Sequence, residues 1–220
     1  MNKEWSEMNK AMQLQLKKKV TYEAGIKTLF ELRAELMLFM RKLKEEFQPE
    51  EFYAMPFMNH KGYESKTLAY SLFHVFRIED IVANTLIQKR EEVFFKEDYP
   101  KRMNSAILTT GNELVKEQIA DFSSKLDLDN LYHYITDVYE ETNQMLLELP
   151  YERLKEKMTE ADKEAIKNLG VVSEDDNAVW LIDYWCGKDI KGLIQMPLSR
   201  HWIMHMEACS RIATKLKKEL

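Results

Sequence analysis

The sequence predicts an all-α protein: a four-helix bundle with short accessory helices in its connections. Only six glycines and five prolines occur among 220 residues, about 5% where an average protein has roughly 12%, so the chain has few turn-forming residues. Four long stretches carry apolar residues at helical spacing. No stretch has a convincing strand pattern. A chain of this length is expected to form one domain, residues 1–220.

The first long helical stretch covers residues 3–47, which contain no proline and one glycine. Its apolar residues at helical spacing run from Ile26 to Leu43, and Arg33 and Lys44 are expected on the polar flank of that stripe. Gly25 is expected to mark a break or bend between a short N-terminal segment and the long first helix.

A loop and a second long helix follow. Residues 47–65 contain two prolines, a glycine and several aromatic residues, which predicts a loop with Ser65 as a candidate helix cap. The second long helix is expected over residues 66–89. The stretch from 93 to 112 is irregular, with "TTGN" as a turn pattern, and a short helix is expected over 113–122.

The third long helix is predicted over residues 128–149, with Asp129 as its N-terminal cap. A short helix follows over 159–170. Thr159 and Asp162 form a capping box at its start, and a glycine follows its end.

Composition excludes several classes of protein. A net charge of −5 argues against a nucleic-acid partner, because phosphate binding needs a basic surface. No apolar run approaches the roughly 18 residues that span a bilayer, and the N-terminus lacks the apolar core of a signal peptide. The two cysteines, Cys186 and Cys209, form no CxxC motif and are expected to be buried free thiols. We therefore expect a cytoplasmic protein without a membrane partner.

The fourth long helix follows Pro197 and holds two of the five histidines, His201 and His205. In helical register both lie on the apolar stripe with Ala208 and Ile212. A spacing of four places the two rings one turn apart on the same side, so both can reach one metal ion.

A third histidine is expected to point inward from the second long helix. His74 lies in the middle of that helix's apolar stripe, whereas His133 falls on the solvent face of the third helix. His60 lies in the loop, where exposure is the default, although it could approach the mouth of a pocket. Three interpretations stay open: a metal site of His74, His201 and His205, a set of hydrogen-bonded core histidines, or a metal-free catalytic or binding site.

Two segments resemble the DinB-like (YfiT-like) family of metal-dependent enzymes: "SLFHVFRIEDIV", which contains His74, and "PLSRHWIMHMEACSRI", which contains His201 and His205. The resemblance implies an up-down-down-up bundle, often a homodimer, and a divalent metal, commonly zinc or nickel, on these three histidines. Characterised relatives include transferases and isomerases that depend on a low-molecular-weight thiol such as bacillithiol, mycothiol or glutathione. The segment 171–196 exceeds the family's minimal pattern, so the small-molecule substrate stays open.

Three imidazole ligands would leave a divalent ion an open coordination position, which favours catalysis over a structural role. The ion could hold a thiol as a thiolate that attacks an electrophile, or it could activate water for hydrolysis. The alternative is a non-catalytic bundle that binds a metal or a protein partner. No Glu-x-x-His and no HExxH motif occurs, which excludes a di-iron carboxylate bundle and a zincin protease.

Polar and aromatic neighbours of the histidines could complete the site. Ser71, Glu79 and Asp80 are candidates for orienting the histidine rings. Ser71 could instead bond to its own helix, and the two acids could form surface pairs with residues such as Arg77. A short helix is expected around Trp180. The aromatic residues that could line a pocket, although the protein core is their commoner place, are Trp180, Tyr184, Trp185 and Trp202.

Overall fold

The computed structural model describes residues 2–57 and 66–219. Every regular element within these residues is helical, and β-pairing there is limited to one isolated bridge between Lys157 and Asp189. The predicted all-α class is therefore confirmed for the described chain.

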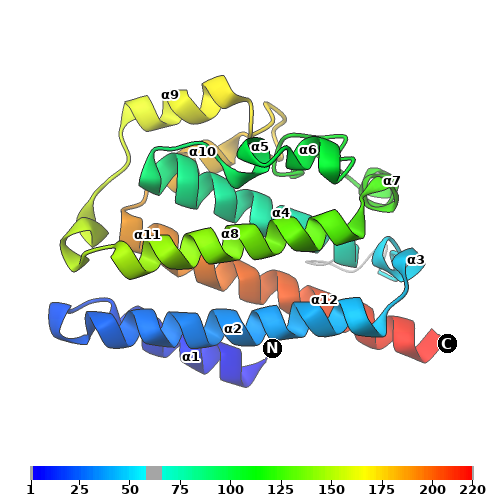
Figure 1. Ribbon diagram of the computed structural model, residues 1–220, viewed down its shortest axis with the longest axis horizontal. Coiled ribbons are helices and arrows are strands. Elements are labelled where there is room, and N and C mark those ends of the chain that lie inside the picture. Colours follow the sequence, from blue (N-terminus) through cyan, green and yellow to red (C-terminus); the bar gives the residue numbers. More distant parts are fainter. Residues whose placement is uncertain (1, 58–65, 220) are drawn as a thin grey trace.

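Four long helices lie lengthwise beside one another (Figure 1). They are α2 (Tyr22–Glu46), α4 (Leu68–Asp80), α8 (Leu128–Glu148) and α12 (His201–Glu219). Helix α4 packs against both α8 and α12, and α2 packs against the same two helices. In the view of Figure 1, α2 and α12 run from left to right, whereas α4 and α8 run from right to left.

Helix α1 (Lys3–Gln15) folds back along α2. The predicted break at Gly25 is wrong, because the chain turns earlier, before and within the 3₁₀ segment Lys19–Thr21. Gly25 lies inside α2, and a Cβ atom there would come within 2.9 Å of Leu16 Cδ2. The glycine is therefore needed for the close approach of the α1–α2 turn.

Short helices occupy the connections. Between α4 and α8 lie α5 (Val93–Lys96), α6 (Tyr99–Arg102) and α7 (Glu117–Lys125), and α3 (Pro49–Phe52) follows α2. Helix α7 overlaps the short helix predicted over 113–122, but it begins and ends a few residues later.

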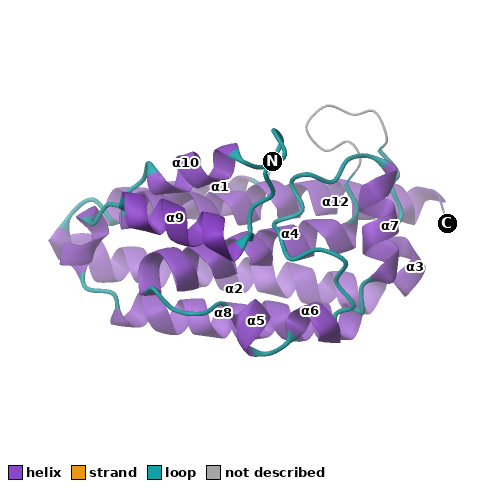
Figure 2. Ribbon diagram, turned by 90° about the horizontal axis from the view of Figure 1, so that it is seen from above, coloured by secondary structure: helices purple, strands orange, loops and turns teal. Residues whose placement is uncertain are grey.

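The connection from α8 to α12 holds a further set of elements: the 3₁₀ segment Tyr151–Lys155, α9 (Glu160–Leu169), α10 (Trp180–Cys186), α11 (Ile190–Gln195) and a π-helical segment, Met196–Arg200. Helices α9 and α10 lie over one side of the long helices (Figure 2). The predicted capping box of Thr159 and Asp162 is confirmed at the start of α9, as is the short helix at Trp180.

The side chains that cap α8 and α4 are not the predicted ones. The side chain that caps α8 is Asp127, which accepts a hydrogen bond from the backbone nitrogen of Asn130, whereas the predicted cap, Asp129, pairs with Lys44 instead. Helix α4 is capped by Thr67, whose hydroxyl accepts from the backbone nitrogen of Tyr70. The other predicted cap, Ser65, lies outside the described residues.

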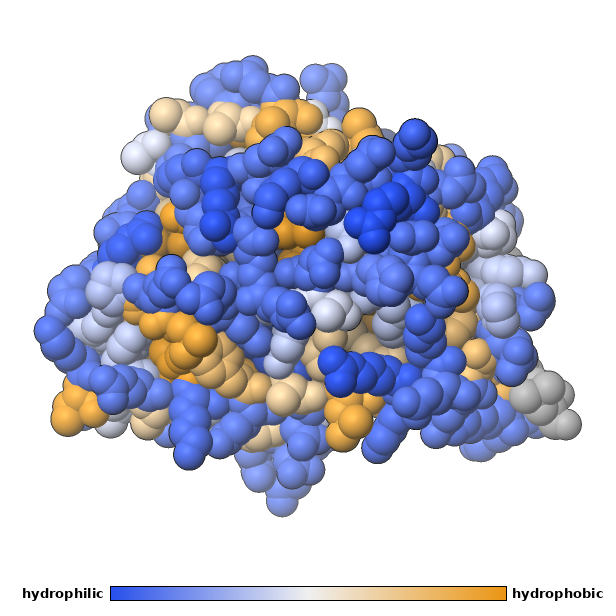
Figure 3. Space-filling model, viewed as in Figure 1, coloured by the Kyte–Doolittle hydropathy of each residue, from blue (hydrophilic) through white to orange (hydrophobic). Residues whose placement is uncertain are grey.

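Buried apolar side chains fill the space between the long helices, in one cluster around Phe73 and Trp202 and another around Ile78 and Trp185. Arg33, predicted on a polar flank, is wholly buried between them. The face shown in Figure 3 is mostly hydrophilic, with separate apolar patches. Among the described residues, no helix combines the length and apolar character needed to cross a bilayer.

Candidate metal centre

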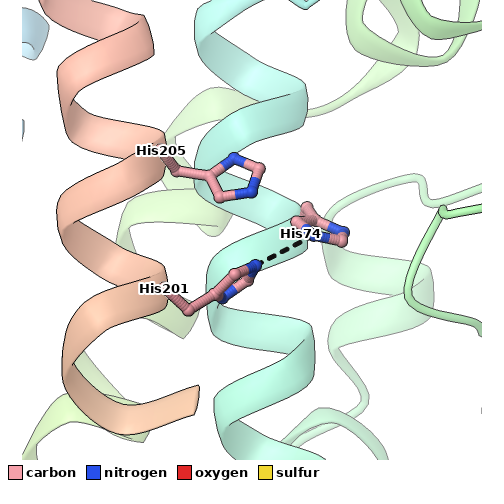
Figure 4. A group of neighbouring side chains, drawn as sticks. All are labelled: His74, His201 and His205. Atoms are coloured by element: carbon pink, nitrogen blue, oxygen red, sulfur yellow. Dashed lines mark hydrogen bonds between the residues drawn. The ribbon is translucent and has the colours of Figure 1, made fainter. Parts of the chain in front are cut away.

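Three histidines from two long helices converge inside the protein (Figure 4). His74 comes from α4, and His201 and His205 come from α12. The Nε2 atoms of His74 and His201 are 3.2 Å apart, and one ligand atom from each of the three rings lies within 4.8 Å of the others. Two imidazole nitrogens on one tetrahedral zinc ion are about 3.3 Å apart. The predicted convergence of these residues is confirmed.

Backbone geometry brings His201 to this place. Pro197 lies in the π-helical segment Met196–Arg200 that leads directly into α12. Proline has no N–H to donate, so the regular hydrogen-bond ladder is interrupted there. Such π segments are frequent at functional sites. Helix α4, which carries His74, continues at Ile81 into a second π-helical segment that ends at Gln88.

A loop holds the ring of His74 from outside. The Nδ1–H of His74 donates to the carbonyl oxygen of Thr110 at 2.8 Å, which leaves Nε2 with the lone pair that faces the other histidines. Tyr70 stacks on the His74 ring, with centroids 5.5 Å apart, and its hydroxyl donates to the carbonyl of Gly111 at 3.1 Å. Sequence reasoning identified "TTGN" only as a turn, because side-chain patterns do not show which backbone carbonyl will accept a hydrogen bond.

Burial keeps all three rings neutral. His74, His201 and His205 expose 5%, 9% and 6% of their surfaces. Burial lowers the pKa of His74 to about 4, despite the opposing effect of the Thr110 carbonyl. Burial, together with the neighbouring histidines and Lys66, also lowers the pKa values of His201 and His205 well below 6.5. Neutral imidazoles are the form that binds a metal.

Hydrogen bonds alone do not satisfy this cluster. The Nδ1 atoms of His201 and His205 are buried and have no hydrogen-bond partner among the described residues. An unpaired buried nitrogen costs about 1–3 kcal/mol. Hydrogen bonds therefore do not account for the whole cluster. An ion on the Nε2 atoms would leave the same Nδ1 atoms unpaired, so the observation that fits a divalent zinc-like ion is the convergence of ligand atoms from three neutral imidazoles.

The candidate orienting residues are not hydrogen bonded to the rings. Glu79 and Asp80 lie in separate buried ion pairs with Arg33 and Arg77. The predicted pairing with Arg77 is therefore confirmed for Asp80, whereas the surface location is wrong for both acids. The buried hydroxyl of Ser71 is hydrogen bonded neither to a histidine nor to its own helix. Within the described chain, the cluster that could hold a metal contains histidines alone.

The other histidines and the cysteines lie apart from this centre. His133 is exposed on α8, as predicted, and His60 lies outside the described residues. Cys186 and Cys209 are free and buried, which confirms the prediction for both. Burial raises the pKa of Cys209 to about 12, so its thiol is a poor nucleophile at neutral pH.

A cavity of about 200 Å³ opens beside the histidines, with His74 and His201 on its wall. Trp180, Tyr184 and Trp185 form another part of that wall. These three aromatic residues therefore line a pocket rather than serving the core alone. Trp202 is the exception, because it is buried and its Nε1 donates to Glu79 at 2.7 Å.

Comparisons with protein-family models, with curated proteins and with solved structures give no match. The described residues define a helical protein with a candidate three-histidine metal centre. Its function has to be inferred from the geometry of that centre.

Proposed function

We propose that this protein is a divalent-metal-dependent enzyme of the DinB-like type, with zinc or nickel held by His74, His201 and His205. The observation that carries the proposal is the 3.2 Å separation of the His74 and His201 Nε2 atoms inside a cluster of three buried, neutral imidazoles. The directions of α2, α4, α8 and α12 in Figure 1 are compatible with the up-down-down-up bundle of that family.

Such an ion would supply a positive charge and an open coordination position, which together lower the pKa of a thiol or a water molecule bound there. The protein itself would do three things. His74, His201 and His205 would offer uncharged ligands, and Thr110 would fix the tautomer of His74 through its carbonyl. The cavity wall would exclude water from the reacting groups.

The charge balance of the site favours an anionic ligand. No carboxylate belongs to the histidine cluster among the described residues, and both nearby acids on α4 are already paired with arginines. A buried divalent charge is stabilised by an anion in its coordination shell. We therefore favour transfer of a low-molecular-weight thiol to an electrophilic substrate, with hydrolysis as the second reaction class.

A non-catalytic metal-binding module is the alternative. It is favoured by one observation: no carboxylate and no lysine among the described residues lines the cavity to act as an acid or base.

Turnover distinguishes these proposals. The zinc- and nickel-loaded protein would be screened with bacillithiol, mycothiol and glutathione against chromogenic electrophiles. Metal-dependent product formation that is lost in His201→Ala and kept in His133→Ala supports the enzyme. Full metal occupancy without turnover of any thiol or ester substrate supports the alternative.

A further inference from the structure

The described wall of the cavity beside the histidines contains no carboxylate, lysine or arginine side chain. Apart from His74 and His201, its described lining is aromatic or aliphatic, with one amide, Asn112. The nearby cation Lys188 lies against the ring of Tyr184 at 4.0 Å, and neither it nor Lys66 is part of the wall.

The size of the cavity limits its ligand. Its volume is about 200 Å³, and a cavity of about 150 Å³ holds one benzene molecule. One substituted aromatic ring therefore fills the available space.

Asn112 gives the cavity one directional polar group. Its Oδ1 atom accepts a hydrogen bond from the hydroxyl of Thr110 at 2.8 Å. The amide nitrogen is then the group that Asn112 can offer to a ligand, and an amide nitrogen donates. A ligand with a carbonyl oxygen would match it.

We propose that this cavity binds one small, uncharged, largely apolar molecule, about the size of a substituted aromatic ring, with a hydrogen-bond acceptor for Asn112. Charged molecules are excluded from the metal-free cavity, because no carboxylate, lysine or arginine on its described wall compensates the loss of their hydration. That this ligand is the electrophilic substrate rests on the function proposed above. The selectivity of the metal-free cavity does not rest on that function, because it follows from the residues of the wall alone.

Benzamide and benzoate test the proposal, since they have nearly the same shape and differ in charge. Chelator-treated protein is titrated with each, so that binding of benzoate to a metal ion cannot contribute. The readout is the chemical shift of the Trp180 and Trp185 indole N–H groups, assigned with Trp→Phe variants. We expect benzamide to shift both signals saturably and to bind at least about tenfold more tightly than benzoate.

Two variants locate the binding. Trp180 is 49% exposed, so Trp180→Ala removes part of the wall without opening the core, and Asn112→Ala removes the amide. Both are expected to weaken benzamide binding several-fold. Val179→Ala is the matched control, because Val179 is 42% exposed beside Trp180 and does not line the cavity.

Equal or tighter binding of benzoate overturns the proposal, and so does a benzamide titration that shifts neither indole signal. Metal content, measured on the same protein before the chelator treatment and again after zinc or nickel is added back, separates this result from the proposed function. One ion per chain without benzamide binding would overturn the cavity proposal and leave the proposed function standing. Benzamide binding by a protein that takes up no metal would overturn the proposed function and leave the cavity proposal standing.

Discussion

The carboxylate of Glu79 accepts hydrogen bonds from both terminal nitrogens of Arg33, at 2.9 and 2.8 Å, where neither side chain has any exposed surface. The same guanidinium donates to the carbonyl of Leu198 at 3.2 Å, and Trp202 donates to Glu79 at 2.7 Å. Leu198 and Trp202 lie on either side of His201. This buried pair therefore joins α2 and α4 to the segment that positions the histidines of α12.

Removal of the charge on Glu79 is predicted to destabilise the fold strongly. Glu79→Gln leaves the Arg33 cation buried without its partner, and breaking a buried pair in this way costs about 3–5 kcal/mol. Urea denaturation measures the free energy of unfolding. Glu31→Gln is the control, because its pair with Lys27 at 4.0 Å is exposed and is expected to contribute less than about 1 kcal/mol. Similar losses in the free energy of unfolding of Glu79→Gln and Glu31→Gln would contradict this account.

A side chain at Gly111 is predicted to weaken metal binding. Its φ is +79°, and a Cβ atom there would lie 3.1 Å from the Tyr70 ring that stacks on His74. Gly111→Ala is expected to cost about 1–2 kcal/mol of stability and to shift the ring of His74. Isothermal titration with zinc measures the affinity.

Gly170→Ala is the matched control for that effect. Gly170 has a φ of +64°, and a Cβ atom added there would meet no other atom within 4 Å, so the substitution carries a similar backbone penalty without a steric clash. We expect both variants to lose stability and Gly111→Ala alone to lose zinc affinity. Equal zinc affinities of the Gly111→Ala and Gly170→Ala variants would show that the 110–112 loop does not position His74.

Acid is predicted to destabilise the metal-free protein below about pH 6.5. The folded pKa values of His74, His201 and His205 are lowered, whereas an unfolded histidine titrates near 6.5. The unfolded chain therefore binds more protons below that pH. The stability that these neutral rings contribute is fully present above pH 6.5 and is lost as the pH falls toward 4 and below.

The slope of stability against pH checks this expectation. Each such histidine adds about 1.4 kcal/mol per pH unit near pH 5. Urea titrations between pH 7 and 5 should give a shallower slope, by about that amount, in His205→Gln. His133→Ala should keep the slope of the parent protein, because its side chain is exposed. An unchanged slope in His205→Gln would mean that this ring is already charged in the folded protein.

The cysteines are predicted to be inert in the folded protein. Burial raises the pKa of both Cys186 and Cys209, which keeps the thiolate fraction small at pH 8. Ellman's reagent should therefore react slowly with the native protein and release two equivalents after denaturation. Rapid reaction of either thiol in the native protein would make it a candidate nucleophile and would weaken the case for an external thiol.

Much of this fold could be predicted from the sequence, because the long helices show their register in the spacing of apolar residues. That register also placed His74 with His201 and His205, since the inward face of each helix is a local property. The position of the first turn could not be predicted in this way. It depends on how closely α1 approaches α2 at Gly25, which is a contact between helices.

The buried ion pairs and the 110–112 loop could not be predicted in the same way. Arg33 and Glu79 look like surface residues until their partners are known, because a charge is buried only where another element supplies the opposite one. Thr110 acts through its backbone carbonyl, which every residue has. The aromatic wall of the cavity depends on how α10 packs over the long helices, and helical spacing does not determine that.

Metal stoichiometry tests the central claim most directly. Elemental mass spectrometry would be applied to untagged protein purified without chelator, beside His201→Ala, His205→Ala and the surface control His133→Ala, each checked for folding by circular dichroism. We predict about one zinc or nickel ion per chain in the parent and in His133→Ala, and none in the other two variants. A well-folded parent that contains no metal and takes up neither ion when it is added would contradict the three-histidine metal centre.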